Sequence, residues 1–217
     1  MTVLPFHSDS DVAAALAVVS PHVRHGGLLA YPTETIYGLG SRAVDTDVAS
    51  LARVKGGREG KPFLLLVSDR GMAERHGLQF SRAARALSDR FWPGPLTLVL
   101  PGGEGALPDS LRGPEGGIAV RWTSHLGMAS LIGQLDQPIT STSANRPGQP
   151  TAPGSGAIVR EFGAAVEDGT LLILDGGVLG NLPPSTVVDC TQASPRTIRD
   201  GAIPLRDLRG AVGSLAP

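Results

Sequence analysis

The chain has two lysines, and both lie in one glycine-rich segment, KGGREGKPF. Lys55 and Lys61 are six residues apart with Arg58 between them, whereas every basic residue outside the segment is arginine. A lysine presents a compact point charge to a phosphate, and a turning backbone can aim N–H groups at an anion. The Walker pattern GxxxxGK[ST] fails, because Lys55 stands where it needs glycine and Pro62 where it needs serine or threonine. We interpret the segment as a candidate anion site, with a solvated basic turn as the alternative.

A second polar segment, YPTETIYGLGSRA (31–43), follows an apolar run and is dense in hydroxyl groups at Thr33, Thr35 and Tyr37. Such a loop can bind a small polar ligand. The alternative is structural, because Pro32 and Gly38 shape turns and threonines satisfy nearby backbone groups.

A third polar segment, PITSTSANRPGQPTA (138–152), ends an expected strand in hydroxyls and an amide. These groups are donors to anions and nucleotides when they are exposed at a strand end. The segment is therefore a candidate binding loop, with an ordinary polar turn as the alternative. Its polar residues are Thr140, Ser141, Thr142, Ser143 and Asn145. Arg121 and Ser185 add polar groups at the ends of two other expected strands.

Several kinds of chemistry lack their sequence signature. The five histidines show no HExxH spacing, and Cys190 is the only cysteine, so neither a cysteine-rich zinc site nor an internal disulfide is possible. Cys190 ends an apolar alternation, which favours a core position over a nucleophile. No G-x-S-x-G nucleophile elbow occurs. The net charge of -1 lacks the overall basic footprint of a dedicated nucleic-acid-binding protein.

Short apolar runs between glycines and prolines predict buried strands that would position these groups. The expected strands are residues 26–32, 62–68, 94–101, 116–122, 138–142 and 169–177, with a terminal pair at 184–190 and 195–201. Apolar spacing predicts helices at 12–25, 46–55, 69–76, 81–91 and 124–135. We expect Ser10 or Asp11 to cap the first helix, Pro21 to end or kink it, and Ser124 to cap the last.

Alternating strands and helices predict an α/β fold with a twisted, mixed, open sheet. The later strands are expected to be joined by loops, and loops 101–117 and 145–156 are candidate binding elements. With 217 residues and 41% apolar residues, the chain is predicted to form one domain over 1–205, followed by a C-terminal tail at 206–217 whose last stretch, RGAVGSLAP, is expected to be frayed. No apolar run approaches the roughly 20 residues of a membrane span, and the N-terminus lacks a signal-peptide pattern. We expect a cytoplasmic protein with no membrane partner.

The ordered motifs resemble YrdC-type L-threonylcarbamoyladenylate synthases. The motifs are YPTETIYGLG, KGGREGKPF, FWPGPLTLVL, GIAVR, TSTSAN, PSTVVD and TIRDGAI. The resemblance covers about residues 10–203 and indicates the short form, without the extra C-terminal domain. It implies a YrdC-like fold, in which flanking helices and a mixed sheet surround a concave, positively lined cavity.

The resemblance implies a reaction in which L-threonine, bicarbonate and ATP give L-threonylcarbamoyl-AMP and pyrophosphate. The product would pass to a threonylcarbamoyl-transfer enzyme that modifies adenosine 37 of tRNAs reading codons that start with A. Mg²⁺ would accompany the triphosphate, with no protein ligand assigned. Possible further partners are tRNA or double-stranded RNA, bound weakly.

The resemblance also implies roles for individual residues. The residues expected to bind L-threonine are Thr35, Arg121, Ser141 and Ser185. Those expected to bind ATP are Lys55, Arg58, Lys61, Ser143, Asn145, Thr151 and Arg199, and the first three would also act in catalysis. The family has Lys-x-Arg where this chain has Lys55, Gly56 and Gly57, with arginine one position later. Arg58 therefore either replaces the family arginine or that contact is lost.

Two alternative functions remain open from the sequence. One is an RNA-binding accessory protein that uses the same basic cavity. The other is a related enzyme that acts on a different carbamoyl acceptor.

Overall fold

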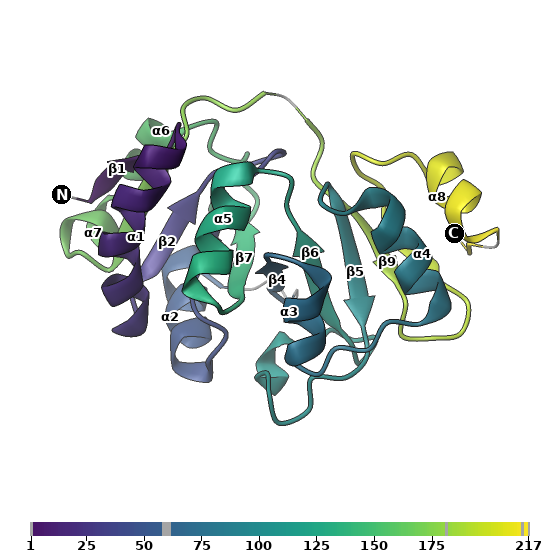
Figure 1. The fold of residues 1–217 in the computed structure, drawn as a ribbon. Helices are drawn as coiled ribbons and strands as arrows, with labels where there is room; N and C mark the ends of the chain where they lie inside the picture. The colour runs from purple at the N-terminus through teal and green to yellow at the C-terminus, as the bar shows by residue number, and fades with distance from the viewer. Residues whose placement is uncertain (1, 58–61, 181, 214, 217) are drawn as a thin grey trace.

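The computed structural model describes residues 2–57, 62–180, 182–213 and 215–216 (Figure 1). Over those residues the strands form one sheet in the order β1-β8-β2-β3-β7-β4-β6-β5-β9-β10. The strands are β1 Val3–Pro5, β2 Leu28–Tyr31, β3 Gly38–Gly40, β4 Leu64–Val67, β5 Leu96–Leu100, β6 Ile118–Trp122, β7 Ile139–Ser143, β8 Leu171–Asp175, β9 Thr186–Asp189 and β10 Arg196–Arg199.

The sheet is mixed, as the sequence predicted. Its parallel pairs are β1–β8, β2–β8, β4–β6 and β5–β9, and its antiparallel pairs are β2–β3, β3–β7, β4–β7, β5–β6 and β9–β10. The terminal pair β9–β10 is also confirmed.

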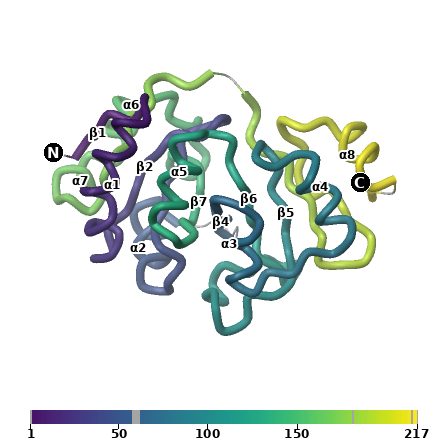
Figure 2. The backbone as a smooth tube through the Cα atoms, in the orientation of Figure 1, coloured from purple at the N-terminus to yellow at the C-terminus, as the bar shows by residue number. Residues whose placement is uncertain are grey.

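Eight α-helices and one 3₁₀ helix accompany the strands in the described part of the chain. They are α1 Asp9–Arg24, α2 Asp45–Lys55, α3 Arg70–Arg75, α4 Arg82–Phe91, η1 Asp109–Leu111, α5 Leu126–Leu135, α6 Ser155–Glu161, α7 Gly163–Glu167 and α8 Leu205–Val212. Helices α1, α5, α3 and α4 lie in front of the sheet in Figure 1, and the tube in Figure 2 shows the N- and C-termini at opposite ends of the molecule.

Strand alternation divides the central strands between two environments, because successive side chains point to opposite faces of a sheet. On β5 the leucines at 96, 98 and 100 are fully buried in the core, whereas Thr97 and Val99 line a cavity. On β6 Ile118 and Val120 are fully buried, whereas Ala119 and Arg121 line that same cavity. The cavity therefore lies on the sheet face opposite the packed leucines.

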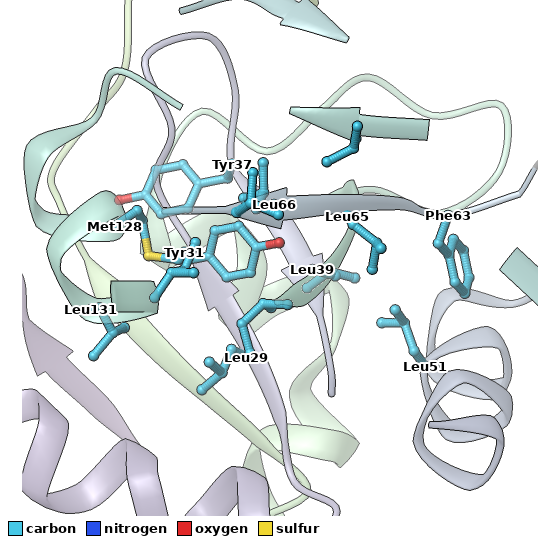
Figure 3. Packing of buried hydrophobic residues seen from close by; sticks show 14 of the residues in the cluster. Leu29, Tyr31, Tyr37, Leu39, Leu51, Phe63, Leu65, Leu66, Met128 and Leu131 are labelled. Atoms are coloured by element: carbon cyan, nitrogen blue, oxygen red, sulfur yellow. The ribbon is translucent and has the colours of Figure 1, made fainter. Parts of the chain in front are cut away.

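Two tyrosines of the polar segment 31–43 belong to the hydrophobic core (Figure 3). Tyr31 and Tyr37 are both fully buried. The Tyr31 hydroxyl donates to the Thr140 carbonyl at 2.9 Å, and the Tyr37 hydroxyl donates to the Gly177 carbonyl at 2.8 Å. Tyr37 thus anchors the start of the segment from β8 to β9, which arches across the sheet in Figure 1. Tyr37 is not among the residues that line the cavity.

The predicted caps of two helices were wrong by one to three residues. Ser8 caps α1 in a reciprocal capping box with Asp11, whose carboxylate accepts the Ser8 N–H. Pro21 does not end this helix, which continues through Arg24. His125, and not Ser124, caps α5, because its Nδ1 accepts the Met128 N–H at 3.3 Å.

The expected loop between β7 and β8 was also wrong, because α6 and α7 lie there. Strands β1 and β3 were not predicted, since each has only three residues and shows little periodicity. Over residues 206–213 and 215–216 the tail is not frayed: Leu208 of α8 is fully buried, α8 packs on α4, and Leu215 is buried beyond it. Apolar residues at 205, 208 and 212 give the helical spacing that the sequence interpretation overlooked.

Candidate active site

A cavity of about 650 Å³ lies against strands β7, β4, β6, β5, β9 and β10. This volume is in the range of small-molecule and cofactor sites. Eight of the predicted site residues line it: Lys55, Arg121, Ser141, Ser143, Asn145, Thr151, Ser185 and Arg199. Arg58 and Lys61 lie outside the described residues. Lys55, Arg121 and Arg199 are the cations among the described lining residues, and Glu115 is the one carboxylate.

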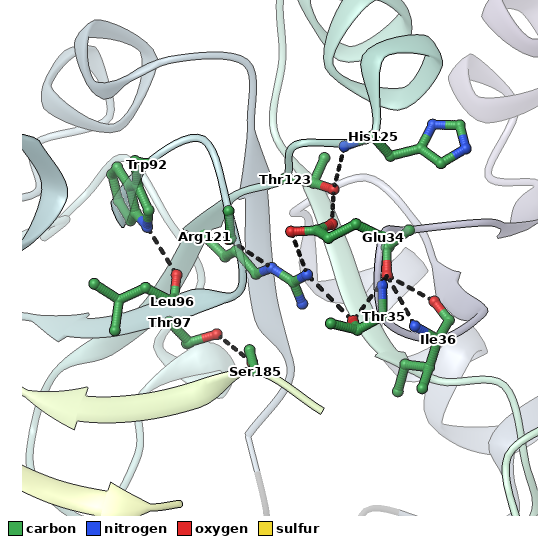
Figure 4. A network of polar contacts seen from close by, with 12 residues as sticks. Glu34, Thr35, Ile36, Trp92, Leu96, Thr97, Arg121, Thr123, His125 and Ser185 are labelled. Carbon is green, nitrogen blue, oxygen red and sulfur yellow. Dashed lines mark hydrogen bonds and ion pairs between the residues drawn. The ribbon is translucent and has the colours of Figure 1, made fainter. Parts of the chain in front are cut away.

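Arg121 is the most buried of these cations, with 4% of the residue exposed. Its Nε donates to the Gly94 carbonyl at 3.2 Å, and its Nη2 donates to Thr35 Oγ1 at 3.2 Å (Figure 4). Its Nη1 has no protein partner among the described residues. Because Arg121 lines the cavity, this nitrogen is a donor available to a ligand carboxylate.

Thr35 is not among the residues that line the cavity, and only 1% of it is exposed. Its hydroxyl accepts from Arg121, so the structure gives it the position of a support behind the guanidinium. Thr33 closes the turn that holds it, because its hydroxyl donates to the Ile36 carbonyl at 2.7 Å.

Glu34 is a site residue that the sequence interpretation missed. Its Oε1 lies 2.8 Å from Arg121 Nη2, and its Oε2 accepts from the Thr123 hydroxyl (Figure 4). Burial alone raises the pKa of Glu34, but the Arg121 charge and the Thr123 hydrogen bond outweigh burial and hold that pKa below its usual value. The carboxylate is therefore ionised at neutral pH. In the sequence Glu34 stands between Thr33 and Thr35, and the interpretation of this segment considered only its hydroxyl groups.

Lys55 is the last residue of α2 and is 7% exposed. Its ammonium donates to the Ser143 carbonyl at 2.6 Å and to Asn145 Oδ1 at 2.9 Å. Gly56 ends the helix directly after it in the left-handed conformation (φ 87°), which glycine adopts without steric cost. The lysine therefore joins the end of α2 to the polar segment after β7.

Arg199 and Ser185 form a third polar group, at the β9–β10 end of the cavity. Arg199 Nη2 donates to the Ser185 carbonyl at 2.8 Å and to its hydroxyl at 3.1 Å. Thr97, a residue the sequence interpretation did not single out, shares a 2.8 Å hydrogen bond with the Ser185 hydroxyl. Burial, and then the positive charge of Arg121, lower the pKa of Arg199. The two guanidiniums are thus close enough to repel each other.

Arg146 was also missed, and it holds the loop after β7 from the far side. Its Nη1 donates to the Val54 carbonyl at 3.0 Å, its guanidinium lies 5.2 Å from the centre of the Phe162 ring, and its backbone N–H donates to Glu161. Asn145 precedes it and faces the cavity. Arg146 and Lys55 therefore fix this loop from its two sides.

Burial raises the pKa of Cys190 to about 12, so the thiol stays protonated and the predicted core position is confirmed. The described residues contain no group of three or more His, Cys, Asp or Glu side chains that could hold a metal ion. Across those same residues, no helix has the length and apolar character needed to cross a bilayer.

The fold and the cavity define an α/β protein that presents arginines, a lysine and hydroxyl groups to a ligand on one face of a mixed sheet. A family model named Sua5_yciO_yrdC and described as "Telomere recombination" matches residues 22–201. The chain belongs to this Sua5/YciO/YrdC family.

Individual relatives agree with this membership. The chain is 33% identical over 201 residues to the threonylcarbamoyl-AMP synthase of Pyrococcus abyssi, covering 92% of this chain and 58% of that protein. The structure of P. abyssi Sua5 complexed with L-threonine has a TM-score of 0.87 and 30% identity, covering 100% of this chain and 62% of the other. The crystal structure of E. coli YciO has a TM-score of 0.78 and 26% identity, covering 95% and 98%. The chain thus spans less than two thirds of the P. abyssi protein.

Proposed function

We propose that this protein makes L-threonylcarbamoyl-AMP and pyrophosphate from L-threonine, bicarbonate and ATP. The observation that carries this proposal is one cavity with two separate polar ends, Arg121 with its supports and Lys55 with the loop after β7. Relatives named threonylcarbamoyl-AMP synthase, over most of this chain, support the same activity.

The Arg121 end is the proposed threonine site. Its open Nη1 pairs with the threonine carboxylate, while Ser141 and Ser185 offer hydroxyls beside it. Thr35 acts here through Arg121, because its hydroxyl is already an acceptor for Nη2.

The Lys55 end is the proposed nucleotide site, with Ser143, Asn145 and Thr151 along one wall. Arg58 and Lys61 complete it in this proposal, and Arg199 faces the nucleotide from the other side of the cavity. Mg²⁺ would accompany ATP and would help to neutralise the charge of the phosphates, and Glu115 is the carboxylate among the described lining residues.

The proposed reaction needs no covalent bond between a side chain and a substrate. The threonine amine attacks bicarbonate and water leaves, which gives a carbamate. A carbamate oxygen then attacks the α-phosphorus, and the bond to pyrophosphate breaks. The residues hold three reactants in line and neutralise the charge of the leaving group. A cavity rich in cations and hydroxyls, with no histidine among its described lining residues, suits this task.

The experiment is an assay of pyrophosphate release from ATP with each co-substrate omitted in turn. We expect turnover to require both L-threonine and bicarbonate. Equal turnover without threonine contradicts the proposal, and turnover with a different amine in its place indicates a related enzyme with another acceptor. RNA binding that weakens steeply with salt, without ATP turnover, indicates the RNA-binding alternative.

Arg58 provides a second prediction, because it follows the position where the family has arginine. We propose that it contacts the triphosphate in place of that residue, since Gly56 and Gly57 permit the loop to shift. Arg58→Ala should then lose ATP affinity about as much as Lys61→Ala, at one fixed salt concentration. A wild-type affinity for Arg58→Ala beside a clear loss for Lys61→Ala shows that the contact is absent, as for an exposed charge worth roughly 0–1 kcal/mol.

The proposed product would pass to an enzyme that transfers its threonylcarbamoyl group to adenosine 37 of tRNA. We expect the protein to act in the cytoplasm, where ATP and tRNA occur together.

A further inference from the structure

The arginines of the cavity must distinguish a carboxylate from a phosphate. An arginine fork binds a carboxylate or a phosphate with similar geometry, and a phosphate carries more charge. If Arg121 carried a full, uncompensated charge, the phosphates of a nucleotide in the same cavity would compete for it with the carboxylate of an amino acid.

The structure places a counter-charge directly beside Arg121. Glu34 Oε1 lies 2.8 Å from Arg121 Nη2, and the two side chains are 16% and 5% exposed. The contact is an ion pair, and Oε1 has no well-aligned hydrogen-bond donor among the described residues. The charge of Arg121 lowers the pKa of Glu34 more than its hydrogen bond does, so the pairing is mainly electrostatic. Taken together, the pair is formally neutral.

Arg199 provides the contrast within the same cavity. Its guanidinium donates to the Ser185 carbonyl and hydroxyl, which are neutral oxygens, and it has no carboxylate partner among the described residues. The positive charge of Arg199 is therefore not cancelled locally, although Arg121 is close enough to lower its pKa. One end of the cavity is balanced and the other is cationic.

We propose, building on the proposed function, that Glu34 determines the specificity of the Arg121 end. Its carboxylate cancels the charge of Arg121, so this end accepts the carboxylate of a neutral, zwitterionic amino acid and excludes phosphate groups. Phosphates are left to the Arg199 and Lys55 parts of the cavity, which keeps the two substrates in separate positions.

The test uses Glu34→Gln, which removes the charge and keeps the size of the side chain. Its matched control is Glu115→Gln, which removes the one carboxylate of the described cavity lining, a residue 4.0 Å from Arg196 and not paired with Arg121. Calorimetry measures the binding of inorganic pyrophosphate and of L-threonine to each full-length protein, alone and in the presence of the other.

We expect pyrophosphate to leave threonine affinity unchanged in the wild type and in Glu115→Gln. In Glu34→Gln it should bind at least tenfold more tightly and displace threonine competitively. Glu34→Asp keeps the negative charge, so its pyrophosphate affinity should be lower than that of Glu34→Gln and its threonine binding less affected by pyrophosphate. The proposed role of the Glu34 charge is overturned if Glu34→Gln loses threonine affinity without gaining pyrophosphate affinity. It is also overturned if pyrophosphate binds to Glu34→Gln but does not compete with threonine.

Two further measurements cover the cases in which Glu34→Gln does not fold or the wild type binds no threonine. If Glu34→Gln does not fold, the double variant Glu34→Gln/Arg121→Gln removes both charges and should bind pyrophosphate as weakly as the wild type. A folded double variant with increased pyrophosphate affinity contradicts the role assigned to Glu34. If the wild type binds no threonine, the proposed function fails, whereas tighter pyrophosphate binding by Glu34→Gln than by Glu115→Gln still supports the charge balance.

Discussion

Arg121→Ala should lose both threonine binding and stability, through two separate causes. A charge-assisted pair with a ligand carboxylate is worth about 1.5–3 kcal/mol, so threonine affinity should fall about ten- to a hundredfold while ATP affinity changes little. Removing one partner of a buried ion pair costs about 3–5 kcal/mol, because Glu34 is left charged with no counter-ion. Calorimetry for binding and urea denaturation for the free energy of unfolding measure the two effects.

The double variant Arg121→Ala/Glu34→Gln separates the causes. It should recover much of the lost stability, because no unpaired charge remains, and it should not recover threonine binding. Unchanged threonine affinity in a folded Arg121→Ala protein contradicts the assigned role.

The stability effect should also depend on pH. The Glu34 pKa is lowered in the folded protein, so the ion pair stabilises fully above the ordinary glutamate pKa, and its contribution is lost as the pH falls through the lower folded-state pKa. In Arg121→Ala the unpaired carboxyl is protonated more readily. The gap in unfolding free energy between wild type and Arg121→Ala should therefore be widest at neutral pH and narrow in acid.

Lys55→Met should weaken nucleotide binding at least tenfold and destabilise the fold. Methionine keeps the apolar stem, but the Ser143 carbonyl and Asn145 Oδ1 lose a charged donor at 2.6 and 2.9 Å. Hydrogen bonds to charged groups are worth about 1.5–3 kcal/mol each, so the free energy of unfolding should fall by at least about 1.5 kcal/mol. ATP titration and denaturant unfolding check the two parts.

Arg53→Met is the matched control, because it removes a positive charge from the same helix at an exposed position. Its effect on stability should stay within about 0.5 kcal/mol, as for most surface substitutions. If Lys55→Met and Arg53→Met lose the same ATP affinity, the effect is one of general charge and Lys55 makes no specific contact.

The sequence determined most of the secondary structure at the centre of the fold. Apolar runs such as 94–101 and 116–122 predicted β5 and β6, since the need to bury these residues is encoded within a few positions. The same local information placed polar groups at strand ends, including Arg121 and Ser143. It failed for β3, whose three residues GLG show no alternation; there Gly40 is required, because a Cβ would lie 2.0 Å from the Thr140 carbonyl oxygen.

Which polar side chains become partners was decided by the tertiary structure alone. Glu34 and Arg121 are far apart in the chain, as are Lys55 and Asn145, and only the sheet order brings each pair together. Thr35, which the resemblance implied to contact a ligand, lies behind Arg121, and Tyr37 anchors a distant segment. Local spacing can say that a residue is polar and near a strand end, but its partner and charge balance depend on which strands become neighbours. The sequence therefore identified eight of the residues that line the cavity, and the fold decided which side chains lie against one another there.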